Sequence, residues 1–395
     1  MMLAPEFLPV WGGVGTYIVE MARHLKDLEL HILTPSRTGF GNEKIKTDYD
    51  MDEIFPDNVH IHFVSEASDT FLYNAKFQYA CFKNAPDIIK ENEIDVIHSH
   101  TAHMPDILLN LRRLNIPTVT TVHTTIKGQR NGTSNSGAGF FDLETSEKMT
   151  YMMYPFLRLM EEHYFSRNSN YIVVSSWMKD QIIEEQNLNP DDIFVVHNGV
   201  NPNTFNPKKA QDAEEIFPQL FNTDKTKILF SSRFVERKGA RFLLNAIPKI
   251  LKKVDAHFIF AGTGKINLNI PKENYTFLNY VDYLKMPYLY SSSDIFILTS
   301  LYENFPLTVL EAMSSGLGVI STEVGGVPEL INSKNGILIP KRDVDAITDN
   351  ITYLVENDQL RNNMGTNARK TIEKKFTWDL AARKTKMVYE RALEA

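Results

Sequence analysis

The segment SLYENFPLTVLEAMSSG combines two carboxylates with the start of a helix, in a spacing that suits phosphate and hydroxyl chemistry. The strand-like run DIFILTS precedes Glu303, and Pro306 stands where the first turn of a helix would begin. The backbone N–H groups of Leu307 and Thr308 would then form an anion site at the helix N-terminus. Glu311 follows one turn later, where a carboxylate is able to accept hydrogen bonds from vicinal hydroxyls. The pattern predicts a ligand with both phosphate and sugar groups, although two glutamates eight residues apart are also common on solvated surfaces.

A basic turn, SSRFVERKG, overlaps the end of the strand-like run KILFSS. Arg233 and Lys238 flank this turn, which Gly239 closes, so both cations are able to reach one diphosphate from the end of a strand. Arg233 would bind in a fork, and Lys238 would act as a point charge. A solvated basic turn is the competing interpretation. It fits Arg237 better, and the sequence assigns no role to that residue.

The glycine-rich turn WGGVG lies between the opening strand and a helix, where Gly12 and Gly13 would let the backbone approach a phosphate or sugar closely. It is not a G-x-G-x-x-G motif, and no acidic residue closes the next predicted strand, Leu30–Thr34. Both observations argue against a dinucleotide site.

His123 ends the strand-like run PTVTTVH. A lone histidine is more often structural, but its position at a strand end, before a long stretch, makes it a candidate for a functional role. The long stretch Lys127–Asp142 follows it and is predicted to be a loop, either a plain surface loop or a lid that contacts substrate. The group His98, His100 and His103 matches no closed zinc site, so no metal is expected.

Alternating strands and helices must position these residues. Strands are expected at Leu30–Thr34, Val59–Val64, Asp95–His98, Thr118–Val122, Tyr171–Ser175, Ile193–His197, Lys227–Ser232, His257–Gly262, Tyr275–Leu278, Asp294–Thr299, Gly318–Ser321 and Gly336–Ile339. Helices are expected at Gly15–Leu25, Phe77–Glu91, Glu147–Phe165, Ala240–Leu251, Leu307–Ser315, Val344–Val355 and Leu360–Glu373. This alternation predicts an α/β fold with two doubly wound, Rossmann-like parallel sheets that face a cleft. The Pro- and Asn-rich stretch NGVNPNTFNPKKAQD separates the two halves.

Length and composition limit the classes of function. The chain has 395 residues, which at roughly 150 residues per domain predicts between two and three domains. Its net charge of −7 argues against sequence-independent binding of nucleic acid. The single cysteine, Cys81, excludes an intrachain disulfide, and no run of 18 apolar residues is present. We therefore expect a cytoplasmic protein, and a weak peripheral contact with a membrane through Arg112 and Arg113 stays open.

Together these motifs resemble the retaining glycosyltransferase family 4, which has the GT-B fold. The resemblance covers nearly the whole chain: WGGVG, TVTTVH, VVHNGV, RFVERKG, FAGTGK, FLNYVD, ENFPLTVLE, EAMSSGLGVISTEVGGVPELI and the closing segment FTWDLAARKTKMVYERAL. It implies an acceptor-side domain at residues 1–203, a nucleotide-sugar-binding domain at 204–375, and a last helix at 376–395 that packs back on the first domain.

The resemblance also implies a role for each site residue. Arg233 and Lys238 would hold the diphosphate, together with the backbone around Leu307 and Thr308, and Glu311 would bind the ribose hydroxyls. The backbone near Val281 would contact the base. The transferred sugar would be contacted by Glu303, Asn304, Phe305 and His123. Gly13, with its neighbour Gly12, would approach the diphosphate. No metal or other cofactor is implied, since the nucleoside-diphosphate sugar is a co-substrate.

The expected activity is therefore retaining transfer of a hexose-type sugar to an acceptor hydroxyl. A nucleotide-sugar epimerase and a non-catalytic nucleotide-sugar-binding protein are the alternatives. The sequence leaves the base, the sugar, the oligomeric state and the nature of the acceptor open, and the acceptor is a lipid, a glycan or a small molecule.

Overall fold

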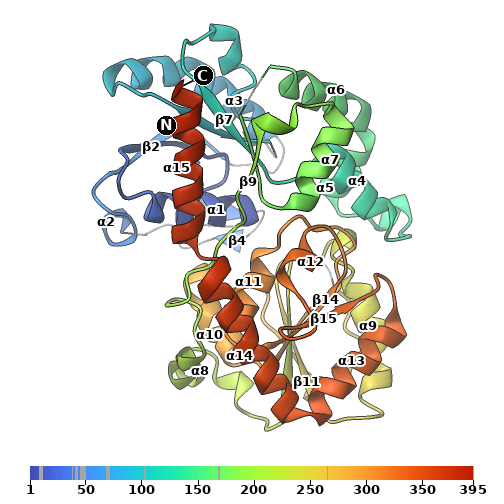
Figure 1. Cartoon of the computed structure of the whole chain (residues 1–395). Coiled ribbons are helices and arrows are strands. Elements are labelled where there is room, and N and C mark those ends of the chain that lie inside the picture. Colours follow the sequence, from blue (N-terminus) through green and yellow to red (C-terminus); the bar gives the residue numbers. More distant parts are fainter. Residues whose placement is uncertain are drawn as a thin grey trace. The chain divides into compact units, whose positions relative to one another are not determined.

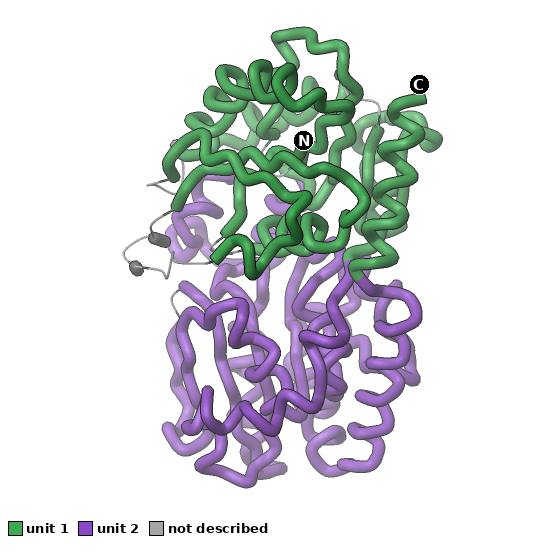
Figure 2. The backbone as a smooth tube through the Cα atoms, turned by 90° about the vertical axis from the view of Figure 1, so that its left-hand side faces the viewer, with its two compact units in different colours: residues 1–126, 153–198, 378–395 green, residues 127–152, 199–377 purple. Residues whose placement is uncertain are grey.

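The computed structural model describes residues 1–8, 12–37, 39–40, 43–44, 50–67, 72–101, 104–167, 170–264 and 266–394. It consists of two compact units, coloured green and purple in Figure 2. Unit 1 comprises Met1–Ile126, Met153–Asn198 and Trp378–Ala395, and unit 2 comprises Lys127–Met152 and Gly199–Thr377. Each unit is built on its own parallel sheet covered by helices, which confirms the predicted α/β class with two Rossmann-like sheets.

The sheet of unit 1 has seven parallel strands in the order β5-β2-β1-β6-β7-β8-β9. Their bounds are β1 (Met2–Leu3), β2 (Leu30–Ser36), β5 (Val59–Glu66), β6 (Ile97–His100), β7 (Thr118–Val122), β8 (Tyr171–Val173) and β9 (Ile193–Val195). A separate antiparallel pair joins β3 (Gly39–Phe40) and β4 (Glu43–Lys44). The helices are α1 (Gly13–His24), α2 (Met51–Ile54), α3 (Leu72–Glu91), α6 (Tyr154–Phe165), α7 (Ser176–Gln186) and α15 (Trp378–Glu394).

The last helix, α15, lies against α1 within unit 1 (Figure 1). Its first residue, Trp378, packs edge-on against the ring of Tyr17 with the ring centroids 5.8 Å apart. Further along, the Tyr389 hydroxyl forms a 2.5 Å hydrogen bond with His98 of β6. The C-terminal segment therefore contributes directly to the core of the unit that also contains the N-terminus.

The sheet of unit 2 has six parallel strands in the order β12-β11-β10-β13-β14-β15. Their bounds are β10 (Thr226–Ser231), β11 (Ala256–Ala261), β12 (Tyr275–Phe277), β13 (Ile295–Leu298), β14 (Gly318–Thr322) and β15 (Ile337–Ile339). The helices are α5 (Thr145–Met152), α8 (Ala210–Ile216), α9 (Ala240–Ile250), α10 (Met286–Ser291), α11 (Leu307–Ser314), α12 (Val327–Leu330), α13 (Val344–Glu356) and α14 (Asp358–Lys375), together with most of α4 (Ile126–Ser134).

The strands of unit 2 are continuous apolar runs because helices cover both faces of the sheet. Ile228 and Ile295 on the two central strands are fully buried, as are Leu243 and Ile247 on α9. The apolar residues of α9 recur every three or four positions, so one stripe of the helix faces this core. Each predicted strand range overlaps an observed strand, which confirms the period-based assignment.

Two element predictions are wrong. The range Glu147–Phe165 is not one helix, because α5 ends at Met152 and α6 begins at Tyr154 with Pro155 in its first turn, where proline fits best. The range Lys127–Asp142 is not a loop throughout, because α4 runs to Ser134 and a 3-10 turn covers Phe140–Asp142.

Candidate functional site

The strand order of unit 2 places a topological switch point between β10 and β13. From β10 the chain moves outward to β11 and β12, and it then returns to β13 on the other side of β10. Sheets of this kind bind ligands beyond the carboxyl ends of the strands at the switch point. The loops that follow these two strands run from Ser232 to Gly239 and from Thr299 to Pro306. Of the residues that the sequence singled out, the two loops contain Arg233, Lys238, Glu303, Asn304, Phe305 and Pro306.

Lys238 and Glu303, one from each loop, form a direct ion pair. The Nζ atom of Lys238 lies 2.5 Å from Oε1 of Glu303, and the Ser300 hydroxyl donates to the same oxygen at 2.6 Å. The side chains are only 17% and 9% exposed, so the pair is shielded from water. A buried ion pair of this kind keeps an ammonium group in a fixed place at the end of the sheet.

The electrostatics of the pair favour an ionised carboxylate. Burial by itself raises the pKa of Glu303, but Lys238, Arg237 and the hydrogen bond from Ser300 outweigh it and hold this pKa below its usual value. Burial lowers the pKa of Lys238, while Glu303 opposes that shift and the neighbouring cations Arg237 and Arg233 add to it. Three cationic groups therefore act on one small region.

The backbones of the two loops are closely joined at Gly239. This glycine has φ +67°, and a Cβ atom built on it would lie 2.1 Å from the carbonyl oxygen of Thr299. The Thr299 hydroxyl donates to the Gly239 carbonyl at 3.0 Å, and the Leu301 amide donates to the Arg237 carbonyl at 2.8 Å. Only glycine fits there, and the close contact of the two loops fixes the backbone position of the preceding residue, Lys238.

Helix α11 starts at the second loop. Pro306 is its N-cap residue, and Leu307 and Thr308 open the first turn. The first amide groups of a helix have no partner within it, so this end of α11 carries the positive end of the helix dipole. Glu311 lies one turn further along and is 8% exposed. Burial, together with the charge of Glu311, raises the pKa of the Tyr290 hydroxyl well above the ordinary value.

Three other predicted residues have different surroundings. The ring of Phe305 is 3% exposed and packs against Phe376, so a ligand would meet its backbone rather than its ring. The carbonyl of the buried Asn304 accepts from the Gly326 amide at 2.8 Å. Val281 follows β12, which lies two strands away from β10 in the sheet.

Two family models match the chain, one for each half. The model described as "Glycosyltransferase Family 4" matches residues 11–204, and the model described as "Glycosyl transferases group 1" matches residues 211–371. The chain belongs to the group 1/family 4 glycosyltransferases. It is a glycosyltransferase, which confirms the coarse activity expected from the sequence.

Individual proteins agree with this assignment. An uncharacterized glycosyltransferase of Methanocaldococcus jannaschii is 27% identical over 388 residues, which cover 95% of this chain and 95% of the relative. Sucrose-phosphate synthase of Thermosynechococcus elongatus has a TM-score of 0.77 at 18% identity, over 100% of this chain and 98% of that one. The Anabaena HepE protein, solved in complex with UDP-glucose, has a TM-score of 0.70 at 16% identity, over 100% and 99%. These similarities show the GT-B fold.

In this glycosyltransferase the other predicted site residues, Gly12, Gly13 and His123, belong to unit 1. Gly12 is the N-cap residue of α1, and a Cβ atom built on it would lie 2.8 Å from a carboxylate oxygen at the flexible end of the Glu6 side chain. Trp11 of the same motif lies outside the described residues.

His123 follows β7 and contacts a second histidine. Its Nε2 atom lies 3.1 Å from Nδ1 of the fully buried His100, and the ring of Tyr17 packs edge-on against it at 4.8 Å. Both ring nitrogens of His98 are hydrogen-bonded, Nδ1 to the Tyr389 hydroxyl and Nε2 to the Thr121 hydroxyl. The third histidine of the predicted group, His103, lies outside the described residues, and within the described ranges no group of acidic, histidine or cysteine side chains is arranged to hold a metal ion.

The sequence missed the contribution of the stretch Lys127–Met152, here called the α4–α5 segment. It belongs to unit 2, although unit 1 residues flank it on both sides. A Cβ atom on Gly128 would lie 2.2 Å from the Tyr302 hydroxyl oxygen, and one on Gly132 would lie 2.7 Å from Cβ of Tyr302. The four-residue spacing places both glycines on one face of α4, where they accommodate the residue that precedes Glu303.

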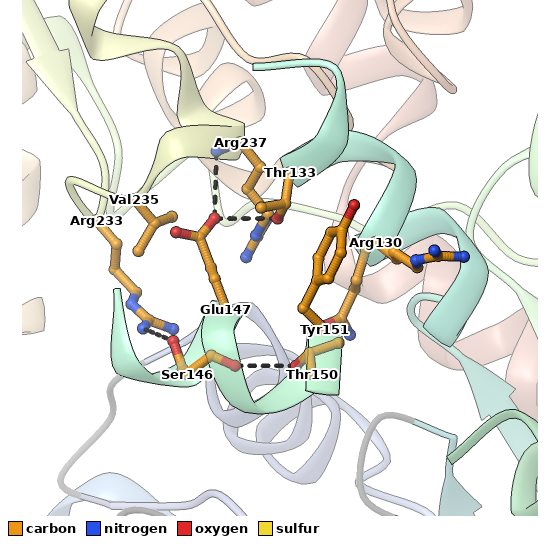
Figure 3. Close-up of a pocket in the computed structure, with 10 residues that line it drawn as sticks. Arg130, Thr133, Ser146, Glu147, Thr150, Tyr151, Arg233, Val235 and Arg237 are labelled. Atoms are coloured by element: carbon orange, nitrogen blue, oxygen red, sulfur yellow. Dashed lines mark hydrogen bonds between the residues drawn. The ribbon is translucent and has the colours of Figure 1, made fainter. Parts of the chain in front are cut away.

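A pocket of about 100 Å³ lies between the α4–α5 segment and the basic turn (Figure 3). Its lining residues are mainly polar and include three arginines: Gln129, Arg130, Thr133, Ser146, Glu147, Thr150, Tyr151, Arg233, Val235 and Arg237. Arg233 donates to the Ser146 hydroxyl at 3.5 Å. The interpretation of Arg237 as a solvated surface residue is therefore incomplete, because its side chain lines this pocket.

Helices able to span a membrane are not found in the part of the chain that the structure describes.

Proposed function

We propose that this glycosyltransferase moves a hexose-type sugar from a nucleoside-diphosphate sugar to an acceptor hydroxyl with retention of the anomeric configuration. The observation that supports this most strongly is the buried Lys238–Glu303 pair beside the start of α11, at the switch point of the unit 2 sheet. The site offers cationic groups for a diphosphate and carboxylates for hydroxyls within two neighbouring loops. The similarity to a protein solved with UDP-glucose supports the same class of donor.

In the proposed reaction, negative charge builds on the departing diphosphate. Arg233, Lys238 and the first amides of α11 would stabilise this charge without moving far, because the two loops already hold them at one edge of the sheet. Preorganised donors of this kind each contribute about 10²–10³ in rate. No metal ion is required for this step in the proposal.

We propose that donor binding changes the hydrogen-bond partner of Glu303. In the structure it accepts from Lys238 and Ser300, and a bound diphosphate would compete with it for the Lys238 ammonium. We propose that Glu303 then accepts a hydrogen bond from a hydroxyl of the transferred sugar, while Asn304 and the backbone of Phe305 provide further contacts. Glu311 would bind the ribose hydroxyls, and the backbone near Val281 the base.

For His123 we propose a hydrogen bond to the transferred sugar. Its Nε2 atom lies 3.1 Å from Nδ1 of His100, at the carboxyl end of β7. Gly12 and Gly13 would allow a close backbone approach to the diphosphate, as the family resemblance implies.

Retention follows if the acceptor attacks from the face that the diphosphate leaves. The bond between the anomeric carbon and the diphosphate oxygen breaks, the new bond to the acceptor oxygen forms on the same face, and the acceptor proton passes to the released diphosphate. In this proposal Glu303 and Glu311 bind different parts of the donor, so they do not act as the acid and nucleophile of a retaining hydrolase.

Two experiments test the proposal. A panel of UDP, GDP, ADP and their sugars should contain one nucleotide that raises the melting temperature, because a ligand that binds only the folded state stabilises it. With that donor and an acceptor, NMR of the product should show the donor's anomeric configuration. An inverted product would refute retention, and the absence of any stabilising nucleotide would refute the donor class.

A further inference from the structure

The α4–α5 segment reaches the basic turn through one buried carboxylate. Glu147 is 7% exposed and points from α5 into the space beside Val235 and Arg237 (Figure 3). Its Oε2 atom accepts from the Glu236 amide at 3.3 Å, and its Oε1 atom accepts from the Arg237 amide at 3.4 Å. Both oxygens therefore contact the backbone of the short 3-10 turn Glu236–Lys238, which ends at the lysine of the switch-point pair.

The same carboxylate is anchored within its own segment. The Thr133 hydroxyl donates to Oε1 at 3.1 Å, and the Glu144 amide donates to Oε2 at 3.3 Å. These contacts fix the side chain from the α4 side and from the start of α5. Glu147 thus connects α4 and the start of α5 to the Glu236–Lys238 turn.

We infer that Glu147 is a positioning residue of the donor site, because it holds the Glu236–Lys238 turn through backbone amides and thereby sets the places of Arg233 and Lys238. The inference rests on the proposed function, in which these two cations bind the donor diphosphate. Ser146, the preceding residue, contacts the Arg233 guanidinium directly and supports the same arrangement.

A purely local role for Glu147 is the competing explanation. Its contact with the Glu144 amide is the second half of a capping box, and glutamine serves that role as well as glutamate. Glutamine, however, has only one acceptor oxygen, and its NH₂ group is a donor. In either orientation of the side-chain amide that Glu147→Gln introduces, one N–H of the turn would face another donor. This substitution therefore separates the two roles.

The expected effect of Glu147→Gln falls on donor binding. The substitution removes one hydrogen bond to a charged acceptor and places a donor opposite a backbone amide of the turn. Binding of the nucleoside diphosphate that the parent protein prefers should therefore weaken about tenfold or more. The ligand-free protein should be destabilised only modestly, by the one opposed turn amide, because the α5 cap is retained when the glutamine oxygen accepts from the Glu144 amide. Glu144→Gln is the matched control, because Glu144 contributes only its backbone amide and undergoes the same change of charge three residues away.

The experiment measures the affinity of full-length protein for UDP, GDP and ADP in the parent, E147Q, E144Q, K238M and E147Q/K238M. If Glu147 acts through the turn, E147Q should lose much less affinity in the K238M background than in the parent. An undiminished loss in that background, or E147Q binding as tightly as E144Q, would overturn the inference. Failure of the parent to bind any of the three nucleotides would instead refute the proposed donor site, and the inference with it.

Discussion

Replacing Lys238 with methionine should destabilise the ligand-free protein strongly, through the carboxylate that it leaves behind. Methionine keeps the length of the side chain but removes the ammonium, so the 9% exposed Glu303 loses the partner that lies 2.5 Å away. Breaking a buried pair from one side costs about 3–5 kcal/mol. The remaining hydrogen bond from Ser300 and the charge of Arg237 place the expected loss near the lower end, about 3 kcal/mol.

This loss should depend on pH in a defined direction. In the parent, the pKa of Glu303 lies below the ordinary value of 4.5, so the ionised pair adds stability above that pH and loses it as pH falls through the lower value. In K238M, burial is no longer opposed by Lys238 and raises the pKa of Glu303. The difference in stability between parent and variant should therefore be largest near pH 8 and shrink as pH falls, because the variant's carboxyl takes up a proton at a higher pH than the parent's.

Thermal unfolding of full-length protein measures this difference. For a unit of about 200 residues, each kcal/mol corresponds to about 2–4 °C, so K238M should unfold about 6–12 °C below the parent near pH 8. The double variant K238M/E303Q, which removes the buried charge, should recover most of this loss without recovering activity. The reasoning is wrong if K238M stays within about 2 °C of the parent at pH 8, or if E303Q brings no recovery.

Three further predictions concern other contacts. Gly132→Val should destabilise unit 2, because its side chain would collide with Tyr302, and Tyr302→Ala in the same chain should restore part of the melting temperature. His98 should stay neutral across pH 5–8, because burial and His123 lower its pKa to about 3, and NMR of labelled histidine should show no titration of this ring. The same histidine takes up a proton in the unfolded chain, so the free energy of unfolding should fall below about pH 6.5. Arg369→Ala should lower the melting temperature, because its guanidinium donates to the carbonyls of Ser314, Phe205 and Pro202 at 2.6, 3.2 and 3.1 Å, whereas the exposed neighbour Lys370→Ala should not.

The parallel sheets and the two loops of the candidate site were predictable from the sequence. Strands such as Thr118–Val122 are short apolar or β-branched runs, and polar motifs follow them directly, so their place at the carboxyl ends of strands follows from topology. The direct pairing of Lys238 with Glu303 was not predictable, because it depends on the close approach of two loops at Gly239. The burial of the Phe305 ring against Phe376 depends in the same way on a residue distant in sequence.

The α4–α5 segment shows why the prediction of a loop was wrong. Glycines at positions 128 and 132 lower helix propensity, and the stretch around them has little apolar periodicity. Tertiary contact reverses this preference, because the ring of Tyr302 occupies the space that those glycines leave. Glu147 was likewise assigned only to a helix, since nothing near it in sequence indicates that its acceptors would meet the amides of Glu236 and Arg237.

The chain passes between the units after residues 126, 152, 198 and 377. A fragment cut from the gene at the obvious midpoint, near residue 199, would therefore encode most of unit 2 without the stretch that lines its pocket and receives Tyr302. Exchange of whole halves between homologous genes would pair each unit 2 sheet with a foreign copy of that stretch. Chimeras of such enzymes should work best when residues 127–152 travel together with the C-terminal half.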